Sequence, residues 1–149
     1  GFKLSEEAQL ISKNFNANKG RLPSPVIRGN VVLGFGKQPH PIVKTATIQS
    51  NGVRIRTSSD VEARTIFDGE VYSIIVSKNN SRTVLIQHGN FFTVYKNLSQ
   101  IYVSKGDKLK TKEVIGKIAT DPLNGQTTLS FSIFYNGVPQ NPRTWIYKL

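Results

Sequence analysis

The side chains that most often carry out chemistry in proteins are scarce in this chain of 149 residues, which has two histidines and no cysteine. His40 lies between two prolines in a predicted loop, and His88 precedes a glycine in a predicted turn. A catalytic zinc ion needs three protein ligands and an open position for water. Two isolated imidazoles make a poor site of that kind, so we expect both histidines to be structural or surface residues.

Other catalytic arrangements find no support in the sequence. Serines and aspartates could be combined with a histidine into a triad, but no G-x-S-x-G turn is present, and a triad is defined by geometry. Glycoside hydrolysis needs two carboxylates across a cleft, whereas the nine acidic residues fall mostly in the first helix or in turns, as Asp68, Asp107 and Asp121 do. The sequence therefore predicts no catalytic residue, no bound metal and no cofactor.

The charge balance favours an anionic partner. The chain has 20 Lys and Arg residues against 9 Asp and Glu residues, a formal net charge of +11. The basic residues are dispersed, and no aromatic nucleic-acid-binding signature is present, so we do not expect nucleic acid as the partner. No apolar run approaches ~20 residues, so no transmembrane segment is predicted.

Residues 4–17 predict a short helix, with Ser5 as its N-cap and Gly20 beyond its end. Its apolar residues recur at helical spacing: Leu4, Ala8, Ile11 and Phe15. One apolar face fits a helix packed on a domain, and it equally fits the end of a longer helix or coiled coil, because three turns cannot establish a heptad repeat. We divide the chain into this N-terminal helix, residues 1–20, and one domain over residues 21–149.

The rest of the chain alternates short apolar segments with turn signals, such as Asn136-Gly137. Turn signals every ~8–12 residues are typical of β sandwiches and barrels. We predict an all-β fold: a two-sheet, mostly antiparallel β sandwich with a short N-terminal helix. Alternation in residues 128–133 predicts Leu129, Phe131 and Ile133 in the core, with Thr128, Ser130 and Ser132 on the opposite face.

Short motifs run through the chain in a fixed order: Gly34-Phe35-Gly36, Gly52-Val53-Arg54-Ile55, Val61-Glu62-Ala63, Asp68-Gly69-Glu70-Val71, Ile86-Gln87-His88-Gly89, residues 93–98, Ile115-Gly116, Leu129-x-Phe131-x-Ile133 and Asn141-Pro142-x-x-Trp145. Each motif is weak alone. Together, over residues 18–149, they resemble the lysostaphin-like (LytM) peptidase domain in the form found in murein hydrolase activators of the EnvC type. The resemblance implies the LytM-like fold, a duplicated hybrid of two β layers.

Active members of that family hold zinc with a histidine and an aspartate in H-x-x-x-D and with the last histidine of H-x-H. The resemblance places these three ligands at Ser50, Arg54 and Ser130, and it places two accessory histidines at Asn97 and Thr128. Serine alcohols do not replace these ligands, and a guanidinium would repel a cation. The resemblance therefore implies a domain without zinc and without peptidase activity.

In the family the zinc site lies in a groove on the sheet, and we expect this groove to bind a partner here. The residues expected on or near it are Asn51, Arg54, Tyr95, Asn97, Ser130, Phe134 and Tyr135. Tyr95 equally fits a role in the core. The resemblance implies a peptidoglycan amidase as partner, zinc-dependent and held inactive by its own inhibitory helix, and a location in the periplasm or cell envelope of a bacterium.

Three other interpretations remain open at this point. The domain could bind peptidoglycan directly without activating an enzyme. It could be a barrel-sandwich hybrid adaptor, which the Val61-x-Ala63 and Asp68-Gly69-x-Val71 motifs also fit, although the Asn-Pro-x-x-Trp ending does not. It could also be an enzyme with a rearranged zinc site, which metal analysis would reveal.

Overall fold

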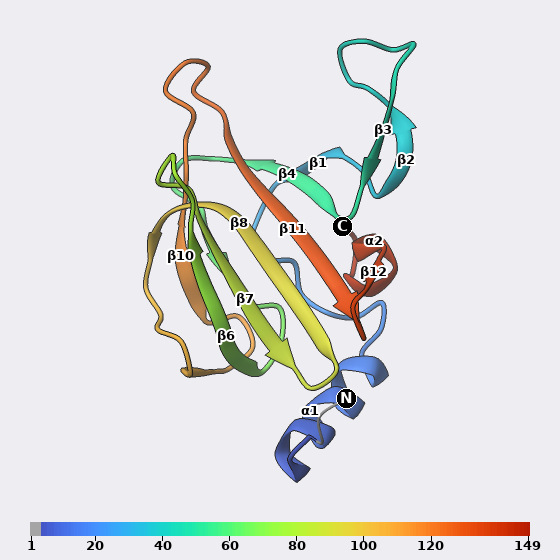
Figure 1. Cartoon of the computed structure of the whole chain (residues 1–149), viewed down its shortest axis with the longest axis vertical. Helices are drawn as coiled ribbons and strands as arrows, with labels where there is room; N and C mark the ends of the chain where they lie inside the picture. The colour runs from blue at the N-terminus through green and yellow to red at the C-terminus, as the bar shows by residue number, and fades with distance from the viewer. Residues whose placement is uncertain (1–3) are drawn as a thin grey trace.

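The computed structural model describes residues 4–149, and it confirms the prediction of a mostly antiparallel β fold with an N-terminal helix (Figure 1). Most strands alternate buried with exposed side chains, because each contributes one face to the core. The elements follow in this order: α1 (Glu6–Ala17), β1 (Asn30–Leu33), β2 (Gly36–Pro39), β3 (Thr47–Ser50), β4 (Val53–Thr57), β5 (Glu62–Arg64), β6 (Gly69–Val76), β7 (Arg82–His88), β8 (Phe91–Ile101), β9 (Lys108–Leu109), β10 (Val114–Ile118), β11 (Thr127–Tyr135), β12 (Val138–Gln140) and α2 (Pro142–Trp145).

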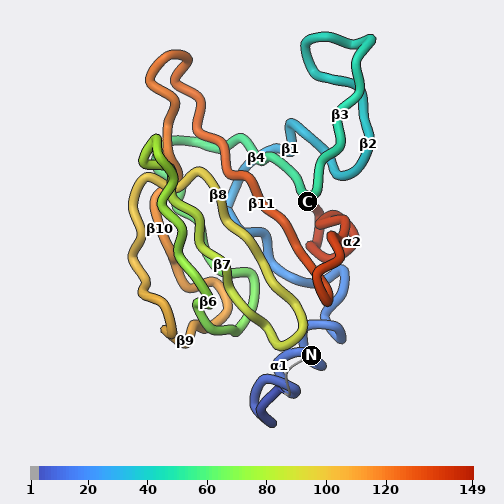
Figure 2. Tube along the Cα trace, in the orientation of Figure 1, coloured from blue at the N-terminus to red at the C-terminus, as the bar shows by residue number. Residues whose placement is uncertain are grey.

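One ten-stranded sheet makes up most of the domain. Seven strands follow one another in the order β1-β4-β11-β8-β7-β6-β9, while β12 pairs with the edge of β11 and β10 pairs with both β5 and β8. The remaining two strands, β2 and β3, form a hairpin that projects away from the sheet (Figures 1 and 2).

The sheet folds into two layers, one around β11 and one around β5 and β10, and the long strand β8 joins them. Its first part, residues 91–96, pairs with β11, whereas residues 98–101 pair with β10. The change of partner occurs at Asn97, whose φ of 74° lies in the left-handed region that asparagine tolerates better than most residues. One continuous strand thus belongs to both layers, and the core lies between them.

Strand β11 runs through the centre of the core, as its alternation predicts. Leu129, Phe131 and Ile133 are completely buried, while Ser130 and Ser132 on the other face are only half-buried. This confirms the predicted register of β11.

Helix α1 contacts the domain from its first turn, where Glu7 pairs with Lys108, to its last, where Phe15 is buried. Ser5 Oγ accepts a hydrogen bond of 3.1 Å from the Ala8 amide, which confirms the predicted N-cap. Phe15 is fully buried, with its ring centroid 4.4 Å from that of Phe91. Gly89, in the β7–β8 turn, has φ +69° and lies so close to the helix that a Cβ there would be 2.3 Å from Cβ of Ser12.

The sequence analysis missed the second helix, α2, which has only four residues. Its signal is present in the chain, because Asn141 caps it by accepting a 3.1 Å hydrogen bond from the Arg143 amide and Pro142 occupies its first turn. The helix places Trp145 against Phe15 and Phe91, which closes the core beneath α1.

Candidate functional site

Three neighbouring strands align three polar side chains in a row. Ser130 of β11 lies directly opposite Arg54 of β4 on one side and opposite Lys96 of β8 on the other. Both basic residues are exposed, and Ser130 is half-buried between them. The row therefore lies on the face of β11 that points away from the core.

A groove with a volume of about 500 Å³ runs over this row. Residues from β1, β4, β8, β11, the projecting hairpin and two turns line it: Val32, Leu33, Pro41, Arg54, Arg56, Ser81, Lys96, Asn97, Gln126, Thr128 and Ser130. We call it the basic groove. Its volume falls within the range of about 300–1,000 Å³ that is usual for ligand pockets.

Among the described residues, the lining of the basic groove carries positive charge and no carboxylate. Arg54, Arg56 and Lys96 supply three cationic groups. The two ion pairs found among residues 4–149 lie elsewhere, at Arg28–Asp60 and Lys108–Glu7. Because the three cations are left to solvent, the groove is suited to an anionic group, which a guanidinium can bind through two hydrogen bonds at once.

Asn97 helps to shape the floor of the groove. Its side-chain Nδ2 donates a 2.7 Å hydrogen bond to the carbonyl oxygen of Thr128, which ties β8 to β11 at the point where β8 changes partner. The backbone oxygen of the same residue accepts from the Ala119 amide at 2.8 Å. Asn97 is thus fixed from both sides.

The three positions that the family resemblance assigns to zinc ligands do not contribute equally to the groove. Arg54 and Ser130 are cross-strand partners and line it. Ser50, at the end of β3, turns its hydroxyl to the backbone and donates a 2.7 Å hydrogen bond to the Gly52 carbonyl oxygen. Asn51 is exposed in the turn that follows and does not line the groove.

Tyr95 was wrongly assigned to the groove, because its side chain is completely buried. Its hydroxyl oxygen accepts a 3.2 Å hydrogen bond from the Ile66 amide and lies 3.0 Å from Oγ1 of Thr93. Burial raises the pKa of Tyr95 to about 12. Both faces of β8 are covered at this point, so Thr93, Val94 and Tyr95 are buried in succession and the usual alternation is lost.

The two aromatic residues at the end of β11 also lie outside the basic groove. Phe134 shares a face with Ser130, but it lies four residues, about 13 Å, further along the strand. Tyr135 is on the other face, and its ring centroid is 4.7 Å from that of Phe91. Of the seven predicted groove residues, Arg54, Asn97 and Ser130 line the groove.

Both histidines form hydrogen bonds within the fold, and neither lines the basic groove. His88 is completely buried, with Nδ1 2.7 Å from the Asp68 carbonyl oxygen and Nε2 2.8 Å from the Thr93 hydroxyl. Burial lowers the pKa of His88 to about 4, so the ring is neutral at pH 7. His40 Nδ1 accepts from the amides of Ile42 and Val43, each at 3.1 Å.

The structure reveals no metal centre in the part of the chain that it describes: no three His, Cys, Asp or Glu side chains in residues 4–149 are grouped so that they could hold an ion. Over the same residues, no helix has the length and apolar composition needed to cross a membrane.

The sequence analysis missed several uncharged residues of the basic groove and two of its three basic residues. Arg56 follows Arg54 by two positions on the same strand, so alternation alone places it on the same face. Lys96 lines the groove because β8 pairs with β11 in one particular register, and no local pattern in the sequence announces that pairing.

Comparisons with known proteins agree with this architecture. Residues 49–142 match the sequence profile of peptidase family M23. No curated protein sequence matches the chain significantly. A chain of the SpoIIQ–SpoIIIAH pore-forming complex is similar in structure, with a TM-score of 0.72 and 22% identity over 88% of this chain and 93% of that one.

Two further solved structures share the fold. Csd3 of Helicobacter pylori has a TM-score of 0.70 and 24% identity over 86% of this chain. A zinc-containing peptidase from Vibrio cholerae has a TM-score of 0.68 and 23% identity over 87% of this chain. The matched region spans 35% and 40% of those two proteins, respectively.

Proposed function

Because the chain belongs to peptidase family M23, we propose that it is a catalytically inactive member that binds and activates a peptidoglycan amidase through the basic groove. The observation that carries this proposal is the pair formed by Arg54 and Ser130. A guanidinium and an alcohol occupy neighbouring positions on the groove floor, at two of the positions assigned to zinc ligands.

The chemistry of that pair argues against hydrolysis. The guanidinium of Arg54 is a cationic group, and its repulsion disfavours a zinc ion in its vicinity. Ser130 offers a neutral hydroxyl, whereas catalytic zinc sites use imidazole, carboxylate or thiolate ligands. A water molecule in this groove would have no metal to lower its pKa. In this proposal, the domain has lost the hydrolytic activity of the family and retains a groove that binds a partner.

The groove also defines the kind of partner surface that we propose. Arg54, Arg56 and Lys96 together favour a segment rich in carboxylates, and the exposed Val32 beside them favours an apolar contact. An inhibitory helix of an amidase with acidic and apolar side chains fits both requirements. Such a helix would place at least one carboxylate against the Arg54 guanidinium.

Activation then requires no chemistry from this domain. If the amidase exchanges between a closed state, in which its helix covers the active site, and an open state, a protein that binds the displaced helix shifts the population toward the open state. The size of the shift is limited by the difference in affinity for the two states. A site of action in the periplasm or cell envelope follows from the proposed partner.

The experiment is a binding and activation assay with purified periplasmic amidases. The domain is immobilised, amidases are tested for retention, and dye release from labelled sacculi is measured for amidase alone, domain alone and both together. We expect release only when amidase is present, and more of it when the domain is added. Release by the domain alone that a chelator abolishes would overturn the proposal. Retention on sacculi without any effect on amidases would favour a peptidoglycan-binding module instead.

A further inference from the structure

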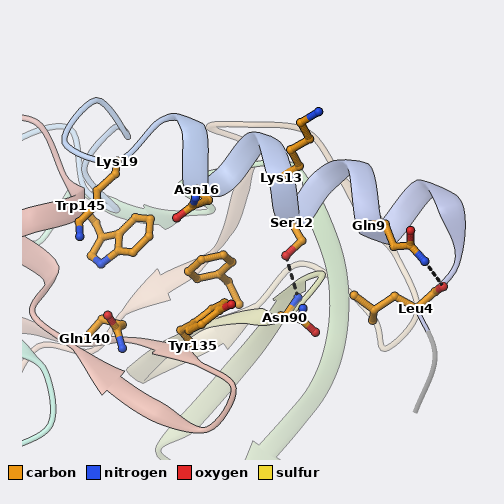
Figure 3. A pocket seen from close by; sticks show the side chains of 11 residues that line it. Leu4, Gln9, Ser12, Lys13, Asn16, Lys19, Asn90, Tyr135, Gln140 and Trp145 are labelled. Atoms are coloured by element: carbon orange, nitrogen blue, oxygen red, sulfur yellow. Dashed lines mark hydrogen bonds between the residues drawn. The ribbon is translucent and has the colours of Figure 1, made fainter. Parts of the chain in front are cut away.

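A second cavity lies beneath helix α1, between the helix, the β7–β8 turn, the end of β11 and α2 (Figure 3). Its volume is about 520 Å³. It is distinct from the basic groove, and none of its lining residues is shared with that groove. We call it the α1 cavity.

One wall of the α1 cavity holds a buried polar group without a partner. Trp145 is 3% exposed, and its indole Nε1 is the one buried side-chain nitrogen or oxygen in residues 4–149 for which no hydrogen-bond partner exists. In Figure 3 this nitrogen is on the edge of the indole that faces Gln140 across the cavity. An indole N–H can only donate. A ligand that brings an acceptor to this point removes the cost of an unpaired donor.

Next to the indole, the cavity offers a fixed aromatic surface. Tyr135 is 41% exposed, and Phe91 supports its ring from the core side at a centroid distance of 4.7 Å. A half-exposed ring that is held in place gives the apolar face of a flat ligand a surface on which to stack. The side-chain amides of Asn16 and Gln140 complete the lining with both donors and acceptors.

The charge of the α1 cavity is positive. Lys13 and Lys19 line it, no carboxylate does, and neither lysine takes part in the two ion pairs found in the described part of the chain. The Lys19 ammonium lies 5.0 Å from the centroid of the Trp145 ring. The ammonium and the unpaired indole N–H therefore act on the same part of the cavity.

We propose that the α1 cavity binds an anionic, N-acetylated saccharide, the class to which the muramic acid units of peptidoglycan belong. A sugar ring has an apolar face for Tyr135 and hydroxyls for the surrounding amides. The acetamido carbonyl accepts from the Trp145 indole, and the carboxylate lies near Lys19. This site would let the domain rest on glycan strands while the basic groove engages a protein.

The chain's single tryptophan makes the proposal directly measurable. Trp145 gives one indole N–H signal in a ¹H–¹⁵N spectrum, and this signal can be followed during titration of the 149-residue chain with N-acetylglucosaminyl-N-acetylmuramic acid. We expect a saturable shift of that signal and at least a fivefold weaker response to the neutral disaccharide N,N′-diacetylchitobiose. A signal that stays in place at millimolar disaccharide overturns the proposal, as does equal binding of both sugars.

Variants separate this site from general surface effects. Tyr135→Ala should weaken disaccharide binding at least fivefold, and Lys19→Gln should reduce the preference for the anionic sugar. Tyr147→Ala, which removes a similarly exposed tyrosine outside the cavity, should bind like the parent. Unchanged binding by Tyr135→Ala would refute the site. Arg54→Ala should bind the disaccharide normally, so loss of amidase activation and loss of sugar binding can be told apart.

Discussion

Arg54 and Ser130 face each other across the antiparallel pair of β4 and β11, with Lys96 of β8 in the same row on the far side of Ser130. Backbone hydrogen bonds fix this arrangement independently of the side chains. A binding surface built in this way can lose or gain individual groups while its floor stays in place. Mutations in the groove should therefore affect binding far more than folding.

The first test concerns Arg54. Arg54→Ala should weaken amidase binding by ~1–3 kcal/mol, the range for truncation of an interface hot spot, because a guanidinium pairs well with a helix carboxylate. A thermal melt should show an unchanged transition, since the side chain is exposed. The matched control is the exterior pair Lys78 and Lys110, whose substitution should alter mainly the salt dependence and the association rate. If the lysine variant loses activation while Arg54→Ala retains it, the groove is not the binding site.

Metal binding is the second test. We expect no stoichiometric zinc in protein dialysed against the metal, as measured by elemental analysis, because the family resemblance assigns Arg54 to a ligand position, where a guanidinium would repel the ion. A triple variant with Ser50→His, Arg54→Asp and Ser130→His should bind zinc, since it restores a three-ligand set. Zinc on the parent chain, or failure of a folded triple variant to take it up, would contradict the assignment of the ligand positions.

The buried His88 makes stability depend on pH. Its folded pKa is about 4, below the ordinary value of 6.5, so the unfolded state binds the proton more readily. The contribution of neutral His88 to the free energy of unfolding is then fully present above pH ~6.5. It is lost as the pH drops toward 4 and amounts to about 3 kcal/mol in all. Urea unfolding between pH 4 and 8 measures this slope.

Two variants identify the group responsible. Replacing His88 with Gln should remove most of the slope below pH 6.5, although it also lowers stability at neutral pH because Asp68 and Thr93 lose their partner. His40→Gln should leave the slope as it is. A slope that survives the His88 substitution would assign it to other groups.

Helix α1 should contribute strongly to stability through one side chain. Phe15→Ala should lower the free energy of unfolding by ~3–5 kcal/mol, because it opens a cavity between Phe91 and Trp145. Leu10→Ala, on the same helix but 58% exposed, should cost less than about 0.5 kcal/mol. Comparable losses for the two variants in urea titrations would mean that the helix is not docked as described.

The correction at Tyr95 is also testable. Tyr95→Phe should cost about 1–2 kcal/mol of stability, because the buried Ile66 amide loses its acceptor. Amidase binding should be unchanged, since the ring is buried beneath the sheet. A binding defect without loss of stability would return Tyr95 to the groove.

Individual residues show how much of the fold and of the site can be predicted from the sequence. Alternation predicts β11 correctly. The same rule places Tyr135 on the face of Phe131, so its assignment to the groove was inconsistent with the predicted register of the strand. Tyr95 could not be placed in this way, because β8 is covered on both faces and alternation disappears. The left-handed conformation of Asn97 accompanies the change of pairing partner from β11 to β10. It depends on residues far apart in the sequence, so no local pattern predicts it.

The separation of the two faces of β11 has a practical consequence for protein engineering. The core packing of β11 comes from Leu129, Phe131 and Ile133. The positions between them, and the neighbouring Arg54 and Lys96, do not contribute to the core. A library randomised at these outer positions should contain mostly folded members. The domain can therefore serve as a display scaffold on which new binding specificities are selected without rebuilding the protein beneath them.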